Sequence, residues 1–269
     1  MTTERPSGSP IWIDYSSNDP ETAKAFYSAL LGWEFEDMGP EFGHYHMIRS
    51  GGNDVGGFMS MADAGAAMDD MGMEGAEAPP AAWSTYLETA DLDATVARAA
   101  ESGITPDVPA MDVGDLGRMA MVTAPDGAHL GLWQAKTYDG FTVEQGHGTP
   151  VWFECMSTDF DAAFPFYRDV LGWEATPMGP EDGGDQEDGT HYFTNGAGDS
   201  ATAGLCDAAQ WFERSLWRTY FAVPDCDAAC AKVTELGGRV ADGPMDTPFG
   251  RIATVIDPEG ATFQLNQDL

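Results

Sequence analysis

The chain contains a long stretch that occurs twice. Residues 26–34 read Phe-Tyr-Ser-Ala-Leu-Leu-Gly-Trp-Glu, and residues 166–174 read Phe-Tyr-Arg-Asp-Val-Leu-Gly-Trp-Glu. Met-Gly-Pro follows both stretches, and an Asp and a Trp precede both, at a constant offset of 140 residues, as from Trp12 to Trp152. A repeat of this length constrains the fold more than any other feature, because both copies must form the same structural unit.

A second pair of blocks extends the repeat to the rest of the chain. Residues 116–130 align with residues 249–263, and both blocks contain Gly-Arg and, further on, Pro-Asp-Gly or Pro-Glu-Gly. Between the blocks, Trp83-Ser-Thr-Tyr aligns with Trp217-Arg-Thr-Tyr. The sequence therefore predicts two homologous domains and a polar, glycine-bearing linker, with the first domain at 1–135, the linker at 136–148 and the second domain at 149–269.

Each half is predicted to contain two modules of one strand, one helix and three strands. Residues 11–16 alternate between apolar and polar and are typical of a strand. Asn18 or Asp19 caps a helix that has Pro20 in its first turn and ends at Gly32. The same order returns from Trp83 onward and then twice in the second half. Residues 62–82, rich in Ala, Gly, Met, Asp and Pro, are predicted to be a flexible connection or a lid.

Composition excludes several kinds of partner. The net charge is −33, from 45 acidic and 12 basic residues, and it disfavours nucleic acids and anionic membranes as partners. Solubility or adaptation to a salty cytoplasm explains this charge equally well. All four cysteines lie in the second half, so a disulfide framework is not expected. No apolar signal or membrane-length run occurs, which predicts a soluble, cytoplasmic protein; a homo-oligomer is compatible with the sequence.

The module order, Phe-Tyr before Leu-Gly-Trp, and Pro-Asp-Gly or Pro-Glu-Gly before the last strand resemble the vicinal oxygen chelate superfamily. Its members include glyoxalase I, bleomycin-resistance proteins and extradiol dioxygenases, and the likeness covers nearly the whole chain. The resemblance implies an α+β fold of two tandem vicinal-oxygen-chelate domains, each of two βαβββ modules that form a cup-shaped sheet. It does not specify the function, because the superfamily includes isomerases, oxygenases, cyclases and drug-sequestering proteins.

Metal-dependent members of the superfamily place His, Glu or Gln on the first and last strands of the modules. The matching positions in this sequence are Trp12, Ser84, Gly131, Trp152, Arg218 and Gln264. A divalent metal needs about three converging ligands, and Gln264 alone is not enough. We therefore predict no metal and no cofactor. The His-Tyr pairs at His44-Tyr45-His46 and His191-Tyr192 are alternative ligands, although packing inherited through the duplication explains their recurrence as readily.

Strand alternation predicts which side chains face each cup. If Trp12 occupies the former ligand position, it faces inward together with Asp14, two residues further on. The side chains placed in the first cup are Trp12, Asp14, Ser84, Tyr86, Glu88, His129 and Trp133. Those placed in the second cup are Trp152, Glu154, Arg218, Tyr220 and Gln264. Glu154 and Arg218 are predicted to form an ion pair, and a register error of one residue would turn every one of these side chains outward.

These residues suggest a function. Asp14, Tyr86 and His129 are predicted to act as general acid or base, and the other cup residues to bind substrate. Trp12 or His129 could instead be structural, whereas a buried carboxylate such as Asp14 is costly without a partner or a task. Aromatic walls suit a flat, conjugated ligand, so we predict a metal-independent enzyme of specialised metabolism that cyclises or dehydrates an aromatic or polyketide-like molecule. The alternatives are a protein that sequesters a drug or metabolite without turnover and, less favoured, a metal-dependent glyoxalase or dioxygenase.

Overall fold

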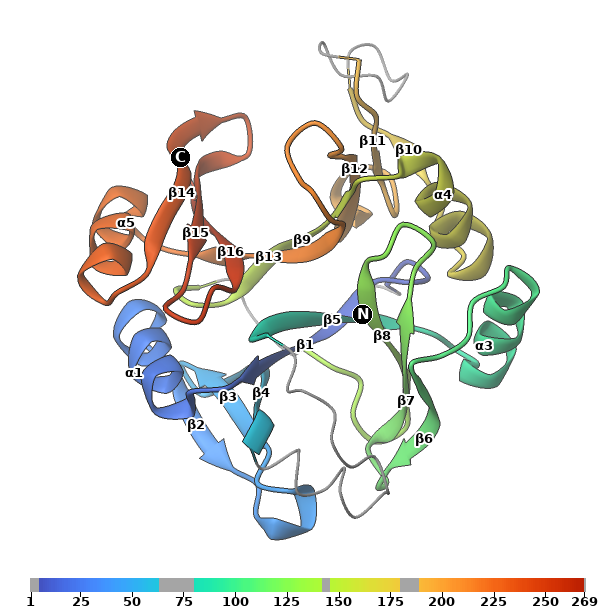
Figure 1. Ribbon diagram of the computed structural model, residues 1–269, viewed down its shortest axis with the longest axis horizontal. Helices are drawn as coiled ribbons and strands as arrows, with labels where there is room; N and C mark the ends of the chain where they lie inside the picture. The colour runs from blue at the N-terminus through green and yellow to red at the C-terminus, as the bar shows by residue number, and fades with distance from the viewer. Residues whose placement is uncertain (1–4, 63–79, 142–145, 180–188, 269) are drawn as a thin grey trace. The chain divides into compact units, whose positions relative to one another are not determined.

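The computed structural model describes residues 5–62, 80–141, 146–179 and 189–268. Its strands and helices follow the same order in both halves of the sequence (Figure 1). The elements of the first half are β1 (Pro10–Ser17), α1 (Pro20–Leu31), β2 (Glu34–Asp37), the short helix η1 (Pro40–Phe42), β3 (His46–Ser50), β4 (Asn53–Ser60), β5 (Ala82–Glu88), α3 (Leu92–Glu101), β6 (Val108–Val113), β7 (Gly117–Thr123) and β8 (His129–Ala135). Those of the second half are β9 (Pro150–Ser157), α4 (Phe160–Pro165), η2 (Phe166–Val170), β10 (Thr176–Pro177), β11 (Tyr192–Thr194), η4 (Gly198–Ser200), β12 (Ala203–Asp207), β13 (Leu216–Ala222), α5 (Cys226–Glu235), β14 (Arg239–Thr247), β15 (Gly250–Ile256) and β16 (Thr262–Gln267).

The strands form two eight-stranded sheets, one from each half of the sequence. Their orders are β2-β3-β4-β1-β5-β8-β7-β6 and β10-β11-β12-β9-β13-β16-β15-β14. The two orders are the same when the halves are aligned, and each sheet is open because its first and last strands are not paired. This topology confirms the predicted α+β fold of two tandem domains, each containing two βαβββ modules.

Helix α1 begins and ends where the sequence predicts. The Asp19 side chain accepts a hydrogen bond from the backbone N–H of Thr22 at 3.3 Å, and Pro20 occupies the first turn. Gly32 ends the helix in the left-handed conformation, with φ at 70°, which glycine adopts without steric cost. The buried face of α1 carries Phe26 and Tyr27 from the repeated stretch. The repeat therefore encodes both the cap and the apolar face of this helix.

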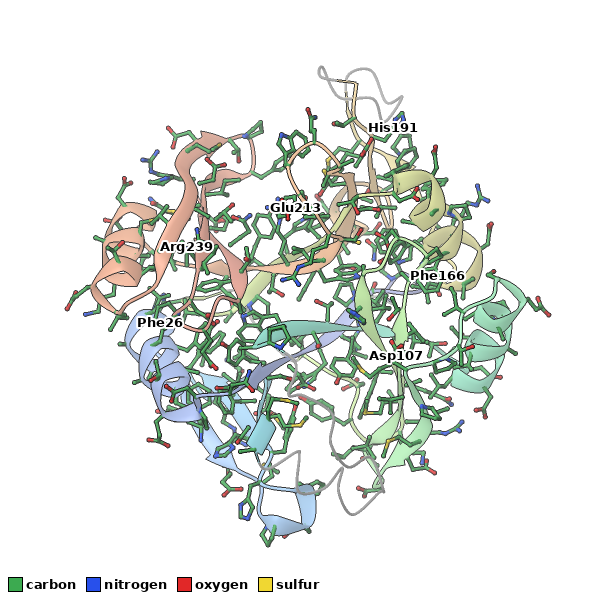
Figure 2. All side chains as sticks on the ribbon, in the orientation of Figure 1. Phe26, Asp107, Phe166, His191, Glu213 and Arg239 are labelled. Atoms are coloured by element: carbon green, nitrogen blue, oxygen red, sulfur yellow. The ribbon has the colours of Figure 1, made fainter. Side chains whose placement is uncertain are left out.

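The corresponding helix of the second half stands at the predicted place but differs from α1 in its helical register. Helix α4 ends at Pro165, and the chain continues as the π-helical segment η2. Pro165 stands where the first half has Ala25. Proline has no N–H to donate, which breaks the regular ladder and favours a local change of helical register. Phe166 on η2 is nevertheless buried like Phe26 on α1, and Figure 2 labels both.

Packing groups the elements into two compact units. We call residues 1–11, 85–140 and 152–218 the central unit, and residues 12–84, 141–151 and 219–269 the terminal unit. In the central unit α3 packs against η2, and in the terminal unit α1 packs against α5. The domain boundaries predicted from the repeat stay a prediction. The predicted connection or lid falls largely on residues 63–79, which lie outside the described residues, as do residues 142–145 of the predicted linker.

The aromatic residues of the repeat form the core of the terminal unit. Neighbouring ring centroids lie 5.0 to 5.7 Å apart in a cluster made by Tyr15, Tyr27, Trp33, Trp83 and Phe221. Tilted and edge-to-face contacts of this kind add to the stabilisation that burial of the rings provides. Trp33, from the repeated Leu-Gly-Trp, and Trp83, near the start of β5, are therefore core residues of this unit.

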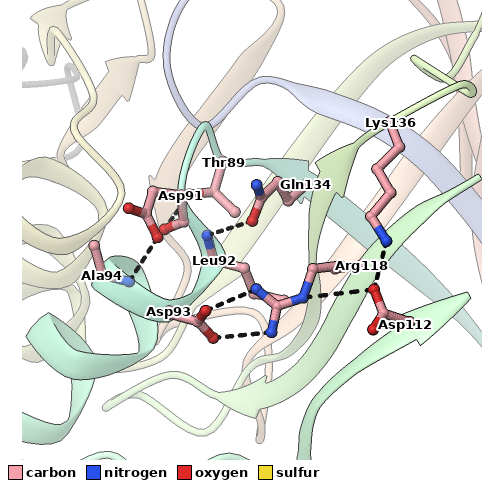
Figure 3. A network of polar contacts seen from close by, with 9 residues as sticks. All are labelled: Thr89, Asp91, Leu92, Asp93, Ala94, Asp112, Arg118, Gln134 and Lys136. Atoms are coloured by element: carbon pink, nitrogen blue, oxygen red, sulfur yellow. Dashed lines mark hydrogen bonds and ion pairs between the residues drawn. The ribbon is translucent and has the colours of Figure 1, made fainter.

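The recurring Gly-Arg motif connects a helix to a hairpin. In the central unit, the Arg118 guanidinium donates two hydrogen bonds to the Asp93 carboxylate at the start of α3, at 2.8 and 3.0 Å (Figure 3). Arg118 Nε also lies 3.8 Å from Asp112 on β6. The guanidinium holds the pKa of the Asp93 carboxyl below its usual range, mainly through these hydrogen bonds. Arg251 of the terminal unit pairs with two carboxylates in the same way, so the motif has a structural role.

Candidate functional site

Asp14 on β1 is a buried carboxylate in the terminal unit, with 7% of its surface exposed. The Tyr45 hydroxyl donates a hydrogen bond to Asp14 Oδ1 at 2.6 Å. Trp12 Nε1 lies 3.0 Å from the same oxygen and 2.9 Å from the Tyr45 hydroxyl oxygen. The Trp12 ring also packs against Phe141, with ring centroids 5.5 Å apart. The predicted pair Trp12 and Asp14 therefore lies together, as alternation along a strand requires.

Gly57 on β4 leaves the space that this cluster occupies. It lies opposite Asp14 in the parallel pairing of β1 with β4. A Cβ atom at Gly57 would lie 1.6 Å from the Tyr45 hydroxyl and 2.2 Å from Asp14 Oδ1. Both distances are far below van der Waals contact, so any side chain here would displace the carboxylate or the hydroxyl. The absence of a side chain at this position is a requirement of the cluster.

The central unit contains a second copy of this arrangement. Trp152 Nε1 donates to the Tyr192 hydroxyl at 3.3 Å, and Glu154 follows Trp152 by two residues on β9. Gly204 lies opposite Glu154 in the β9–β12 pairing, and a Cβ atom there would lie 2.1 Å from the Tyr192 hydroxyl. The pattern of Trp, carboxylate, Tyr and Gly is thus a property of the duplicated unit.

The two copies differ in how the carboxylate is compensated. Arg218 donates two hydrogen bonds to Glu154 Oε2, at 2.6 and 2.9 Å, which confirms the predicted ion pair. Both side chains are largely buried, and the guanidinium lies 5.8 Å from the Phe212 ring centroid. The residue equivalent to Arg218 in the first half is Ser84, which is uncharged. The position that supplies a cation to Glu154 supplies none to Asp14.

Tyr86 and Gly131 lie together in the central unit. They are partners in the parallel pairing of β5 with β8, and a Cβ atom at Gly131 would lie 2.1 Å from the Tyr86 ring. The Tyr86 ring therefore occupies the space that a side chain at position 131 would need. Trp133, two residues further along β8, is buried and donates from Nε1 to the backbone carbonyl of Tyr138 at 3.1 Å.

His129 and Glu88 have their described contacts elsewhere. His129 stands at the start of β8 with 74% of its side chain exposed, and its Nδ1 lies 2.9 Å from the Thr123 hydroxyl and 3.8 Å from Asp107 Oδ2. Glu88, at the end of β5, lies 3.7 Å from Arg5. These contacts involve none of the other predicted site residues. The catalytic role of His129 and the binding role of Glu88 stay predictions.

The remaining predicted residues of the terminal unit are Ser84, Tyr220 and Gln264. Tyr220 and Gln264 are partners in the β13–β16 pairing, and both are buried. The Gln264 amide and the Thr254 hydroxyl exchange hydrogen bonds, at 2.9 and 3.2 Å. Ser84 is half-buried on β5. The Gln264 amide is therefore engaged by the neighbouring strand β15.

The donor set does not fit a divalent metal. Among the residues that the structure describes, no group of three or more His, Cys, Asp or Glu side chains could hold an ion. The alternative ligands have other contacts: His44 Nδ1 lies 2.9 Å from Asp37, and His46 Nε2 lies 2.9 Å from Lys24. A metal site of the usual kind needs about three converging N or O ligands, which these residues do not provide. We therefore derive no chemical step through a metal.

Tyr45 and Tyr192 are site residues that the sequence reasoning missed. The recurring His-Tyr pairs are compatible with metal ligands or with inherited packing, and neither interpretation predicts a contact of these tyrosines with the carboxylates. A further signal was available, because Tyr45 and Gly57 precede Tyr192 and Gly204 by the same 147 residues. Two pairs that keep one spacing across a duplication indicate residues that lie against each other.

Among the described helices of the chain, none is long and apolar enough to cross a membrane.

Comparisons with known proteins agree with this fold and its duplication. The sequence matches the glyoxalase/bleomycin resistance protein/dioxygenase superfamily over residues 11–132 and again over 150–265. CFP32 of Mycobacterium tuberculosis, whose name assigns it provisionally as a glyoxylase, is 35% identical over 98% of this chain and 96% of its own. The anthracycline biosynthesis protein DnrV of Streptomyces peucetius is 33% identical over 96% of this chain and 92% of its own.

Solved structures with a similar fold include a dioxygenase and a glyoxalase. The 2,3-dioxygenase LapB of Pseudomonas sp. KL28 aligns with a TM-score of 0.64 at 13% identity, covering 98% of this chain and 93% of its own. The Mn(II)-bound glyoxalase of Novosphingobium aromaticivorans aligns with a TM-score of 0.63 at 13% identity, covering 99% and 84%. At this identity the structures support the fold alone. Together with the sequence matches, they show that the chain is a tandem two-domain member of the glyoxalase/bleomycin resistance protein/dioxygenase superfamily.

Proposed function

We propose that the protein is a metal-independent enzyme of specialised metabolism that performs acid–base chemistry on an aromatic or polyketide-like molecule. Its proposed base is Asp14, and the reaction is a cyclisation, a dehydration or a related proton transfer. The observation that carries the proposal is the difference between the two duplicated carboxylates. Glu154 is paired with Arg218, whereas the equivalent position beside Asp14 holds Ser84.

Charge compensation determines how well a carboxylate accepts a proton. A guanidinium within hydrogen-bonding distance of a carboxylate favours the ionised form of that carboxylate. Neutral donors such as Trp12 and Tyr45 stabilise the ionised form less. Asp14 has a serine, not an arginine, at the equivalent position, which leaves this carboxylate without the ion pair that engages Glu154. On this ground the first copy is the better candidate for proton transfer.

The substrate class is supported by the surroundings of Asp14 and by two relatives. The indole of Trp12 and the Phe141 ring pack beside the carboxylate, and aromatic walls favour flat, conjugated ligands. The relatives DnrV and DauV are named for anthracycline biosynthesis, and each is matched over 96% of this chain. The net charge of −33 favours neutral or cationic substrates over polyanions.

The proposed chemistry needs only a proton acceptor and a returning proton. The Asp14 carboxylate, held by Trp12 and Tyr45, is the proposed acceptor of a proton from a carbon or hydroxyl group of the substrate. The same proton then returns to the product or to a leaving hydroxide, which restores the carboxylate. The acid–base roles of Tyr86 and His129 stay predictions from the sequence; both residues belong to the central unit, whereas Asp14 belongs to the terminal unit.

The test compares Asp14→Asn with Glu154→Gln as its matched control. Asparagine keeps an oxygen to accept from Trp12 and Tyr45 but replaces Oδ2, so the cluster is retained and the base is lost. Each protein is incubated with a metabolite extract of the native host, with and without a chelator, and products are followed by mass spectrometry. We expect conversion by the wild type and by Glu154→Gln, no conversion by Asp14→Asn, and no effect of the chelator.

Other outcomes would identify the alternatives. A compound that is retained unchanged by the wild type and by Asp14→Asn indicates sequestration without turnover. The acidic surface would favour a cationic compound in that case. Conversion that stops when the chelator is added indicates metal chemistry and refutes the proposed mechanism.

A further inference from the structure

We infer that Tyr45 is a positioning residue that orients Asp14 and keeps it ionised for proton transfer. The inference rests on the proposed function, in which Asp14 is the base. Tyr45 is not among the acid–base residues that alternation along the strands predicts, because it lies immediately before β3 on a different part of the chain. Its role follows from the direction of the hydrogen bonds around the carboxylate.

An indole N–H can only donate, which fixes the direction of each bond in the cluster. Trp12 Nε1 lies 2.9 Å from the Tyr45 oxygen, so that oxygen accepts from Trp12. The single hydroxyl hydrogen of Tyr45 is then directed to Asp14 Oδ1, 2.6 Å away. Oδ1 accepts from both side chains and therefore carries no proton of its own. The arrangement fixes the plane of the carboxylate and gives Oδ2 a defined direction.

The backbone before Tyr45 holds this side chain in place. His44 has φ at 56°, a left-handed conformation that residues other than glycine rarely adopt. Its ring Nδ1 lies 2.9 Å from Asp37 Oδ2. The backbone N–H of Met38 donates to the carbonyl of Tyr45 at 2.9 Å, and that of Tyr45 donates to Phe42 at 3.2 Å. Unfavourable backbone conformations persist where the surrounding structure holds them, often beside functional groups.

Gly57 provides an independent observation. A Cβ atom at this position would lie 1.6 Å from the Tyr45 hydroxyl oxygen, closer than any other contact of the cluster. The strand that pairs with β1 has thus kept a glycine where only glycine admits the hydroxyl. Three features therefore place the Tyr45 hydroxyl at Asp14 Oδ1. They are the short hydrogen bond between the two groups, the left-handed backbone of His44 and the glycine opposite Asp14.

The duplication supplies the control. Tyr192 holds the equivalent position in the central unit, where its hydroxyl accepts from Trp152 at 3.3 Å and the nearby carboxylate is paired with Arg218. Tyr192→Phe removes the same atom from the equivalent position, at the start of β11. The Asp14 carboxyl should respond to Tyr45→Phe and not to Tyr192→Phe.

The experiment measures the Asp14 carboxyl directly. Aspartate is labelled with ¹³C at the carboxyl carbon, the Asp14 signal is assigned by its loss in Asp14→Asn, and its pKa is determined by NMR titration. We expect the pKa to rise by about one unit in Tyr45→Phe, because a hydrogen bond to the ionised form is lost. It should stay constant in Tyr192→Phe. Trp12→Phe removes the other donor and should raise the pKa in the same direction.

The results separate two failures. An unchanged pKa in folded Tyr45→Phe overturns the inference, and if that variant does not fold, an unchanged pKa in Trp12→Phe overturns it instead. If Asp14→Asn still converts substrate, the proposed function fails, whatever the titration gives. If Asp14→Asn abolishes conversion and the pKa does not respond to either donor, the function stands and the role of Tyr45 is refuted.

Discussion

The hydroxyl of Tyr27 lies in a buried polar network of the terminal unit, and its removal gives a quantitative test of the structure. The Tyr27 side chain is fully buried; its hydroxyl donates to Asp257 Oδ2 at 2.8 Å and accepts from Trp83 Nε1 at 3.0 Å. Asp257 also accepts from the Tyr15 hydroxyl at 2.6 Å and from two backbone N–H groups at 2.9 Å. Four donors around one buried carboxyl require the ionised, acceptor-only form.

The central unit contains the same tyrosine without the carboxylate. Tyr167 is equally buried and accepts from Trp217 Nε1 at 3.1 Å, but its hydroxyl donates to the sulfur of Cys155 at 3.3 Å. Ala124 stands at the position equivalent to Asp257. Tyr27→Phe and Tyr167→Phe therefore remove the same atom from the same packing and leave the same indole without its acceptor. The two changes differ in whether the lost partner is charged.

The expected difference follows from the hydrogen bonds alone. A bond to a charged group contributes about 1.5–3 kcal/mol, and a neutral bond about 0.5–1.5 kcal/mol. The cost of the orphaned indole is common to both variants and cancels in the comparison. Tyr27→Phe should therefore lower the free energy of unfolding by about 1–2 kcal/mol more than Tyr167→Phe does.

The assay is urea denaturation followed by far-UV circular dichroism and tryptophan fluorescence. Two probes are needed because a chain with two compact units can unfold in more than one step. If the probes separate, the midpoint and slope are compared for each transition, with equal slopes as the condition for a stability comparison. Equal destabilisation by the two variants, or a larger effect of Tyr167→Phe, would refute the assignment of an ionised Asp257.

Two further predictions concern the thiols and the surface charge. Burial raises the pKa of Cys226 to about 12, so its thiol stays protonated at pH 8 and should resist iodoacetamide. The half-buried Cys206 should be alkylated first. Equal labelling of the two cysteines in the native protein, measured by mass spectrometry, would contradict the burial of Cys226. At a net charge of −33 the acidic side chains repel one another in the folded protein, and salt screens this repulsion. Raising NaCl from about 0.05 M to about 0.5 M should therefore raise the urea concentration at the unfolding midpoint. A lower midpoint would show that the loss of ion pairs outweighs the screened repulsion.

Features that the sequence predicted correctly depend on short-range rules. Asp19 and Gly32 define the ends of α1 through a cap and a left-handed residue, both of which are local. The contact between Trp12 and Asp14 follows from the spacing of two residues along a strand. The ion pair of Glu154 with Arg218 needed one more step, the alignment of the two halves, which placed both residues on the same face of adjacent modules.

Features that the sequence did not predict depend on contacts between distant segments. Tyr45 reaches Asp14 from a loop, and no spacing along the chain fixes where a loop side chain ends. The change of helical register after Pro165 is not predicted by the repeat, because the first half has alanine at the equivalent position. The repeat also does not predict how the modules group into the central and terminal units. A sequence repeat identifies segments that are alike, but it does not identify the segments that pack together.

The duplication makes charge compensation the feature that distinguishes the two halves. Both copies carry a Trp, a Tyr and a Gly around a carboxylate, so aromatic content alone would assign them the same function. The difference is one position, Ser84 against Arg218, and it separates a carboxylate held by neutral donors from one held in a buried ion pair. Removal of one partner of such a buried pair costs about 3–5 kcal/mol of stability, so Glu154 and Arg218 have a structural role as a pair. Asp14 has no arginine at the equivalent position, and Trp12 and Tyr45 donate to it instead. In the proposed function it is therefore Asp14, and not Glu154, that transfers the proton.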